Sequence, residues 1–372
     1  MNAVASLNTA ICAQYGLDYP IFGFTHDRAV VAAISRAGGM GVFGAAYFTP
    51  EQVDEDLVWI AEQCQGRPFG VDVMIPSVGE TVDESDLGAM LVQLSQRIPA
   101  AHREFVESLL TRFGVGPLPD GVEVADVFPL GPSRQAAERH IESALRRGAS
   151  LIVSALGVPP DDAVTEAHRQ GVKMGGMVGS PKHAKHHLRA GVDLVIAQGS
   201  EAAAHAGEIS TMVLVPEVVD ACGSIPVLAA GGIATGRQFL AARALGAQGI
   251  WTGSMWRTAA ENTESKGVVE LLLKAGSGDT VRSRCMTGKE LRQLRSPWND
   301  AWSEPGAAVP LPMPLQRMSV TEAEQRIEYH GRDELVVSPI GQVVGQLNEV
   351  KPAAELIADL VAGYEAALGG LA

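Results

Sequence analysis

Short runs of apolar residues recur along the chain and alternate with segments of helical length. The runs show no regular alternation of apolar and polar positions, which is typical of strands buried on both faces of a parallel sheet. The intervening segments are rich in alanine, begin near capping residues and mostly end at a glycine, as helices do. We therefore predict eight strands, at residues 20–24, 40–45, 69–75, 150–156, 173–178, 193–198, 226–230 and 249–254.

Eight strand-and-helix repeats predict an α/β protein that forms a closed (β/α)8 TIM barrel, because such a barrel contains eight of these units. An open, doubly wound sheet is the alternative fold. Nucleotide-binding sheets of that kind carry a G-x-G-x-x-G turn after the first strand, and this chain has no such turn there. The pattern therefore favours the barrel.

Two parts of the chain fall outside the repeats. Residues 77–124 form an insertion of acidic and helical character, and the tail after residue 281 has an irregular stretch followed by helical segments. We predict a barrel made of residues 1–76 and 125–280. We also predict a smaller, mostly helical lobe, made of residues 77–124 and 281–372, that covers the mouth of the barrel.

Composition narrows the class of protein. The chain has 372 residues, of which 46% are hydrophobic, and a formal net charge of −14. Nucleic acid and anionic membranes attract clustered Lys and Arg, so neither is a favourable partner for an acidic chain. The first residues lack the pattern of a signal peptide, and no stretch approaches the roughly 18 apolar residues of a membrane span. We expect a cytoplasmic protein without nucleic-acid or membrane partners.

Cysteines and histidines give no indication of a metal site. The four cysteines are widely spaced and include no C-x-x-C pair, which favours free thiols in a reducing compartment. The segment "KHAKHH" at 182–187 places His183 and His187 on one helix face, but no third ligand lies nearby in the sequence. Structural zinc sites need four ligands and catalytic ones three, so we predict no metal.

Glycines follow the last two predicted strands. Active sites of (β/α)8 barrels lie at the C-terminal ends of the strands, and phosphate sites recur after strands seven and eight. Gly231 and Gly232 end the seventh strand, and Gly253 and Ser254 end the eighth. Glycines let backbone N–H groups approach an oxyanion closely. We predict that these residues hold one phosphate; the alternative is that the glycines only form tight turns.

The sixth predicted strand leads into "QGSEAAAHAG" at 198–207. The amide of Gln198 lies at the strand end, where it suits the edge of a heterocyclic ring, and Gly199 and the small residues after it leave room for a flat ligand. His205 lies at the lip and is either a general base or a surface histidine. Pairing with a neighbouring cation is the favoured explanation of Glu201.

Five segments add evidence of another kind. They read "AGGMGVFGA", "RPFGVDV", "AGVDLVIAQGSEAAAHAG", "IPVLAAGGIATGRQFLAARALGAQGIWTGSMW" and "MTGKELRQLRSPW". In sequence and in order they resemble the nitronate monooxygenase family, formerly called 2-nitropropane dioxygenases. The resemblance extends over nearly the whole chain, is most specific between residues 192 and 256, and is weak across 77–124 and 297–330. Flavin-dependent enoyl-thioester reductases belong to the same superfamily.

The resemblance implies a TIM barrel that holds FMN, with a mostly helical second domain. The family's histidine after the sixth strand matches His205. Family residues that bind the cofactor match five positions of this chain, with serine in place of the usual threonine at the last of them: Gln198, Gly231, Gly232, Gly253 and Ser254.

Some positions depart from the family pattern. "AAAH" at 202–205 stands where the family has glycines before the histidine, which narrows the backbone freedom of this loop. Asp72 replaces an asparagine that lies against the flavin in the family, and a carboxylate there disfavours an anionic reduced flavin unless it is protonated or turned away. "GFT", beginning at Gly23, replaces "APM" on the wall above the cofactor, and His26 follows it. Asp72 and Gly23 are candidate cofactor contacts.

Two activities follow from the resemblance. In the first, an FMN-dependent oxidoreductase oxidises alkyl nitronates with O2 to carbonyl compounds and nitrite, and His205 takes the α-proton of a nitroalkane or orients the nitronate. In the second, NAD(P)H reduces α,β-unsaturated acyl-CoA or acyl-carrier thioesters through FMN. The segments "SPWNDAW" and "RQLR" (292–295) then either contact a CoA phosphate or form an exposed loop of the lobe. Both activities imply a small-molecule substrate, and a homodimer is a possible assembly. A barrel that only binds a ligand is the third and least favoured option.

Overall fold

Eight parallel strands close into a barrel in the computed structural model, which describes residues 7–75, 87–122, 124 and 133–371. The strands are β1 (Ile21–Thr25), β2 (Met40–Gly44), β3 (Phe69–Val73), β4 (Leu151–Ser154), β5 (Lys173–Val178), β6 (Leu194–Gln198), β7 (Val227–Ala230) and β8 (Gly249–Thr252). Each strand pairs with the next one along the chain, and β8 pairs with β1. The predicted fold class is confirmed, and every predicted strand overlaps an observed one.

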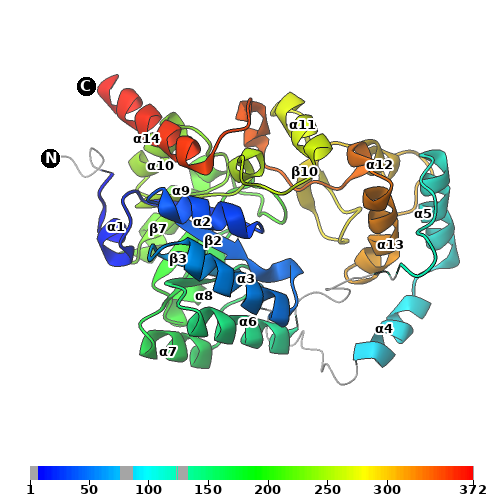
Figure 1. Ribbon diagram of the computed structural model, residues 1–372, viewed down its shortest axis with the longest axis horizontal. Coiled ribbons are helices and arrows are strands. Elements are labelled where there is room, and N and C mark those ends of the chain that lie inside the picture. Colours follow the sequence, from blue (N-terminus) through cyan, green and yellow to red (C-terminus); the bar gives the residue numbers. More distant parts are fainter. Residues whose placement is uncertain (1–6, 76–86, 123, 125–132, 372) are drawn as a thin grey trace.

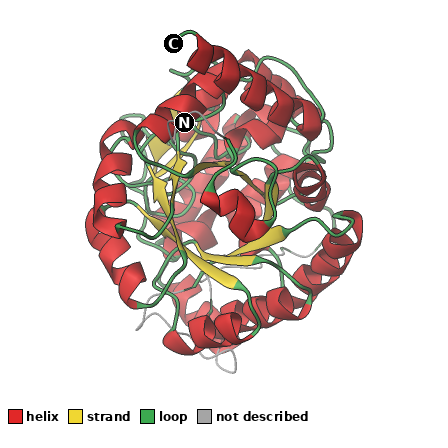
Figure 2. Cartoon of the chain, turned by 90° about the vertical axis from the view of Figure 1, so that its left-hand side faces the viewer, coloured by secondary structure: helices red, strands yellow, loops and turns green. Residues whose placement is uncertain are grey.

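Helices surround the strands (Figure 2). They include α1 (Ala10–Tyr15), α2 (Arg28–Arg36), α3 (Pro50–Gln63), α6 (Arg134–Arg146), α7 (Asp161–Arg169), α8 (Pro181–Arg189), α9 (Thr211–Cys222) and α10 (Gly236–Ala244), with short 3-10 turns η1 (Ala45–Tyr47) and η3 (Ser254–Thr258). Side-chain oxygens of Asp27, Thr49 and Thr235 accept hydrogen bonds from first-turn N–H groups and so begin α2, α3 and α10. In the described residues, no helix is long and apolar enough to cross a membrane.

The strands bury side chains on both faces. Their inward side chains form an apolar cluster inside the barrel, which includes Phe22, Met40, Val42, Leu151, Val153, Leu194, Ile196 and Leu228. Outward side chains such as Val71 and Ile152 pack against the helices. Because apolar side chains fill the inside, polar strand residues that face inward meet open space at the C-terminal ends of the strands.

A second group of helices lies beside the barrel (Figure 1). It contains α4 (Leu87–Gln96), α5 (Ala100–Arg112), α12 (Pro297–Ala301) and α13 (Leu315–Tyr329). Trp298 of α12 is fully buried in a cluster with apolar side chains of α5 and α13. Arg326 of α13 donates to the Glu107 carboxylate of α5 at 2.8 Å. The described parts of the predicted insertion and tail therefore contact each other; residues 77–86 lie outside the described residues, and the domain boundaries stay a prediction.

The segment between the barrel and α12 contains strands that the sequence pattern did not predict. It consists of α11 (Lys266–Lys274) and an antiparallel pair, β9 (Thr280–Ser283) and β10 (Leu291–Leu294). These strands are four residues long and partly polar, so they lack the apolar run by which the barrel strands were found. The short turns η4 (Asp333–Leu335) and η5 (Gln342–Gln346) follow α13.

The C-terminal helix α14 (Ala353–Gly369) packs against α10 and α2 of the barrel (Figure 1). At this contact a Cβ on Gly236 would lie 2.0 Å from the backbone nitrogen of Tyr364, so only glycine lets the two helices meet. The predicted lobe included this helix. Its contacts with α10 and α2 place it in the helical layer around the strands, and the boundaries of the lobe stay a prediction.

Candidate active site

The C-terminal ends of the strands surround a cavity of about 220 Å³. Residues of β3, β6, β7 and β8 and of the loops after β1, β2 and β6 border it. Seven of the nine predicted site residues line this cavity: Asp72, Gln198, His205, Gly231, Gly232, Gly253 and Ser254. Their individual roles stay predictions, but the barrel brings them to one place.

Gly23 and Gly199 do not line the cavity, and neighbouring side chains explain both glycines. A Cβ on Gly23 would lie 2.6 Å from Ile34 Cδ1 and 2.8 Å from the Trp256 ring, which pack behind β1. A Cβ on Gly199 would lie 2.0 Å from the hydroxyl oxygen of Thr211. Successive strand residues point to opposite faces. The missing side chains of these two glycines therefore leave space for side chains of the elements that surround the barrel. The structure gives no contact between either of them and the cavity.

Two turns border the cavity at the ends of β7 and β8. Gly231 and Gly232 have φ angles of 92° and 71°, which residues with a side chain rarely adopt. The backbone N–H groups of Gly231, Gly232, Gly253 and Ser254 donate no hydrogen bond to any residue that the structure describes. Unpaired N–H groups on two adjacent turns suit an anion such as a phosphate.

Glu201 holds the loop after β6 in place. Its carboxylate accepts hydrogen bonds from the backbone N–H and the hydroxyl of Thr211, both at 2.9 Å. Thr211 begins α9, and an acidic group is favourable there because first-turn N–H groups lack partners within the helix. The sequence favoured a side-chain cation as the partner of Glu201. In the structure its hydrogen-bond partner is the start of a helix.

Arg292 of β10 fixes the same loop from the tail of the chain. Its backbone N–H donates to the carbonyl oxygen of Ala204 at 2.8 Å, and its own carbonyl accepts from the Ala204 N–H at 3.0 Å. The guanidinium donates to the carbonyl oxygen of Ser200 at 2.9 Å and to the Thr280 hydroxyl at 3.0 Å. These bonds engage the Arg292 side chain within the protein. The contact of this segment with a CoA phosphate stays a prediction.

Ala204 has a φ angle of 56°. This left-handed conformation is disfavoured for residues with a Cβ and is routine for glycine. The third alanine of "AAAH" therefore occupies the position where a glycine would fit without strain. The two backbone hydrogen bonds to Arg292 hold it there.

His205 lies at the rim of the cavity with its ring orientation fixed. Its Nδ1 donates to the carbonyl oxygen of Glu290 at 2.8 Å, and Nε2 lies 3.4 Å from the Thr287 hydroxyl. Since a carbonyl oxygen only accepts, the neutral ring carries its proton on Nδ1 and presents the Nε2 lone pair. Desolvation is the main cause that lowers the pKa of His205, with Lys289 adding to it, so the ring is neutral at pH 7.

His26 presents a second imidazole to the cavity. Its Nδ1 donates to the carbonyl oxygen of Gly44 at 2.7 Å, and its ring contacts Phe24 and Tyr47 edge-on. The ring fills the space of the missing Gly44 side chain, since a Cβ there would lie 2.6 Å from it. Burial lowers the pKa of His26, chiefly by desolvation, so this ring is also neutral at pH 7 and offers Nε2.

Asp72 is the most deeply buried polar group among the predicted residues. Its side chain is 3% exposed, and burial raises the pKa of its carboxyl to about 8. The amide of Gln198, at the end of β6, makes no hydrogen bond to a described residue. Both side chains therefore have polar atoms to offer a ligand.

Sequence reasoning missed the part of the site that comes from the tail. Gly341 and Val343 line the cavity. The Gly341 N–H donates to the Ser254 hydroxyl at 2.9 Å, and the N–H of Gln342 donates to the carbonyl oxygen of Glu201 at 3.0 Å. The available signal was "SPIGQVVGQ" at 338–346, where two glycines lie among short apolar runs.

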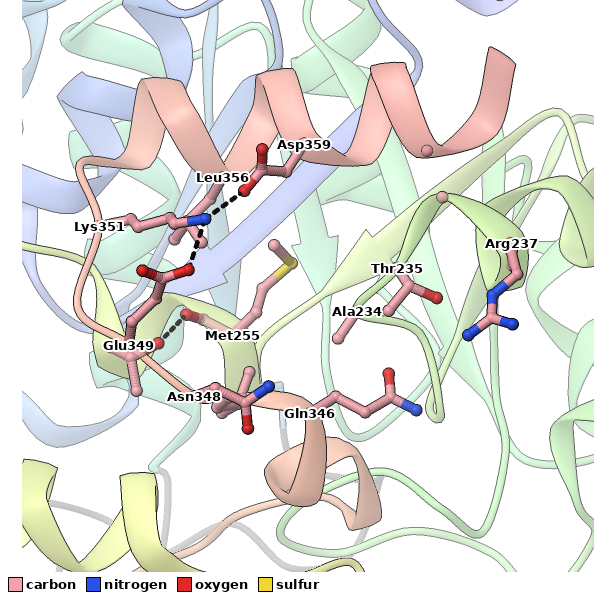
Figure 3. Close-up of a pocket in the computed structure, with 14 residues that line it drawn as sticks. Ala234, Thr235, Arg237, Met255, Gln346, Asn348, Glu349, Lys351, Leu356 and Asp359 are labelled. Atoms are coloured by element: carbon pink, nitrogen blue, oxygen red, sulfur yellow. Dashed lines mark hydrogen bonds and ion pairs between the residues drawn. The ribbon is translucent and has the colours of Figure 1, made fainter. Parts of the chain in front are cut away.

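A second pocket, of about 360 Å³, lies between the start of α10 and the start of α14 (Figure 3). Three of its charged side chains pair with one another: Lys351 lies 2.7 Å from the Glu349 carboxylate and 2.8 Å from that of Asp359. Arg237 lines the pocket as well. None of the predicted site residues lines it. The cavity at the strand ends is therefore the candidate active site.

Known proteins share both the sequence and the architecture. A family model described as nitronate monooxygenase matches residues 6–363. A protein of Mycobacterium tuberculosis (strain ATCC 25618 / H37Rv) named "Putative monooxygenase Rv1533" is 42% identical over 371 residues, 98% of each chain. A nitroalkane oxidase structure from Streptomyces ansochromogenes has a TM-score of 0.77 at 23% identity, over 97% of this chain and 100% of that one. FabK from Thermotoga maritima has a TM-score of 0.71 at 23% identity, over 98% and 99%.

Fold, site and family together define the class of protein, which is an oxidoreductase built on a (β/α)8 barrel. The chain belongs to the nitronate monooxygenase family, because the family model covers almost its whole length. Enzymes of this family are flavin-dependent in general. The two structural likenesses concern the fold alone.

Replacing Ala204 with glycine tests the strain in the loop after β6. The left-handed conformation costs a residue with a Cβ roughly 1–2 kcal/mol, whereas alanine-to-glycine changes elsewhere cost roughly 0.4–1 kcal/mol through chain entropy. We expect Ala204→Gly to keep or raise the free energy of unfolding in urea. The matched control Ala202→Gly should lower it by about 0.4–1 kcal/mol. Equal losses in both variants would show that Ala204 is unstrained.

Proposed function

We propose that the protein is an FMN-dependent nitronate monooxygenase, which oxidises alkyl nitronates with O2 to carbonyl compounds and nitrite. One observation carries the proposal: a single cavity holds an imidazole with a fixed tautomer and, on two glycine turns, N–H groups that have no partner among the described residues. The N–H groups suit a phosphate, and the imidazole suits a carbon acid or its anion. Membership of the family supports the same activity.

The residues at the cavity fit FMN. The N–H groups of Gly231, Gly232, Gly253 and Ser254 would hold its phosphate, since they lack partners among the described residues. The Gln198 amide would bind an edge of the ring. When bound, FMN supplies the redox chemistry. The residues of the chain then bind the cofactor, orient the substrate and move a proton.

His205 supplies the proton chemistry in this proposal. Glu290 occupies Nδ1, so Nε2 is the atom that takes the acidic α-proton of a nitroalkane. With a nitronate that arrives already deprotonated, the same ring orients the anion. The pKa of His205 is lowered, so its base form is present at neutral pH. Activity that depends on this base is lost only as the pH falls through the lowered value, below the usual range near 6.5.

Anaerobic reduction of the purified flavoprotein tests the proposed activity. We expect an alkyl nitronate to bleach the flavin absorbance and NADH and NADPH to leave it unchanged. Because O2 is the oxidant in the proposed reaction, admission of air should restore the flavin absorbance and release nitrite. Rapid bleaching by a nicotinamide, with none by the nitronate, would instead assign the reductase activity on unsaturated acyl thioesters.

Removing the imidazole of His205 tests its role. We expect His205→Ala to retain bound flavin and to lose turnover of a nitroalkane by roughly 10²–10⁴, the usual contribution of a general base. His183→Ala, which removes an exposed histidine of α8, is the matched control and should leave turnover unchanged. Unchanged turnover in His205→Ala would make this histidine a bystander and would turn attention to His26.

Adding a charge to the glycine turn tests the phosphate site. A Cβ on Gly232 would have space, since its nearest neighbour is Glu201 Cβ at 3.5 Å, but the φ angle of 71° strains any side chain there, so the Asp and Asn variants share that strain. We expect Gly232→Asp to release FMN through like-charge repulsion, and Gly232→Asn, which has nearly the same shape, to retain more of it. Gly278→Asp, at an open position, is the control. Equal flavin content in the Asp and Asn variants, measured by absorbance, would contradict an anion at this turn.

A further inference from the structure

The carboxyl of Asp72 has no hydrogen-bond partner among the residues that the structure describes. It faces the cavity from β3, its side chain is 3% exposed, and its Oδ2 makes no hydrogen bond to any described residue. On the neighbouring strands, Gly44 of β2 and Val153 of β4 lie opposite it, and neither has a side-chain donor. Buried polar groups are normally paired because an unpaired one costs stability. A residue with only a packing role here would be apolar.

The outer face of β3 does not involve Asp72. Phe69, Val71 and Val73 alternate with it along the strand and pack in an apolar cluster with helices α2 and α6. Asp72 therefore points into the mouth of the barrel, where a bound molecule is the only partner left among the contacts that the structure describes. This placement makes the carboxyl part of the site.

The surroundings keep this carboxyl uncharged. Its titratable neighbours around the cavity are His26 after β1, Tyr47 after β2, and Glu201 and His205 after β6. Both imidazoles are neutral at pH 7, and the Glu201 carboxylate is bound to the start of α9. Burial alone raises the pKa of Asp72 to about 8, with no contribution from a neighbouring charge. At neutral pH the group is a carboxylic acid with a proton to donate.

The position of β3 in the barrel decides which part of a ligand Asp72 meets. The strands follow one another around the barrel in chain order, so β3 is four strands from β7 in either direction. Asp72 thus lies across the mouth from the glycine turn at the end of β7. A molecule whose phosphate is held at that turn and whose body crosses the mouth meets Asp72 with its other end.

We infer that Asp72 is a positioning residue for the flavin: as a neutral carboxylic acid it donates a hydrogen bond to an acceptor atom of the ring system, at the end remote from the phosphate. This inference rests on the proposed binding of FMN. It makes flavin affinity depend on a proton carried by the protein. Ionisation of Asp72 removes the donor and places a negative charge beside acceptor atoms, so affinity is full below the pKa of Asp72 and falls as the pH rises through it.

Titration of the apoprotein with FMN between pH 7 and pH 9.5, followed by quenching of flavin fluorescence, tests the inference. We expect the Kd of the wild-type protein to rise by roughly tenfold per pH unit above pH 8. Asp72→Asn keeps the shape and a donor but cannot ionise, so its Kd should match the wild type at pH 7 and stay level up to pH 9.5. Asp18→Asn, which changes an exposed carboxylate before β1, should follow the wild-type profile.

The outcomes separate this inference from the proposed function. FMN that binds at no pH would contradict the proposed cofactor itself. FMN that binds with the same pH profile in the wild type and in Asp72→Asn would overturn the role of Asp72 alone. Affinity that increases with pH in the wild type only would also overturn it, because the ionised carboxylate would then be an acceptor.

Thermal unfolding of the apoproteins measures whether Asp72→Asn folds and how its stability compares with that of the wild type. The folded pKa of Asp72 lies above its unfolded value near 3.9, so the acid's contribution to stability is lost as the pH rises toward 8. Asp72→Asn should therefore melt at a higher temperature than the wild type at pH 8, with a smaller difference at pH 5. A variant that melts lower at both pH values would mean that the wild-type carboxyl is paired within the protein, which would also overturn the inference.

Discussion

The pairing of β8 with β1 is the interaction on which the site depends. It closes the sheet, and closure brings to one opening the residues that follow strands far apart in the sequence. Asp72 and Ser254 border the same cavity although 181 positions separate them along the chain. An open sheet of the same strands would spread these residues along one edge, and no single ligand would reach all of them.

Closure of the barrel does not by itself fix the loop after β6, which needs further contacts. Three separate parts of the protein hold this loop: the start of α9 through Glu201, strand β10 through Arg292, and the start of η5 through Gln342. Two of these anchors come from the tail of the chain. The tail is therefore structural support for His205, whose Nδ1 also bonds to the tail residue Glu290. Catalytic geometry on a loop needs such a second layer of contacts.

Sequence patterns predicted the barrel because buried strands and capped helices leave a strong local signal. They also identified residues that line the cavity wherever the position of a strand end was enough to place the residue, as for Gln198 and Gly232. Gly23 and Gly199 do not line the cavity, because the face toward which a glycine near a strand end points depends on strand register and on packing behind the strand. The anchoring by Arg292 and the lining by Gly341 depend on contacts between distant parts of the chain, which no local pattern contains.

The two imidazoles of the cavity have the same arrangement, with Nδ1 bound to a backbone carbonyl oxygen and the ring uncharged at neutral pH. With Asp72 also protonated, the groups free to face a ligand bring dipoles and no ions. Among the described residues that line this cavity none is a lysine or an arginine, and the chain as a whole carries a net charge of −14. Capture of an anion is therefore governed at short range, by the shedding of its water and the fit of its oxygens to oriented N–H groups.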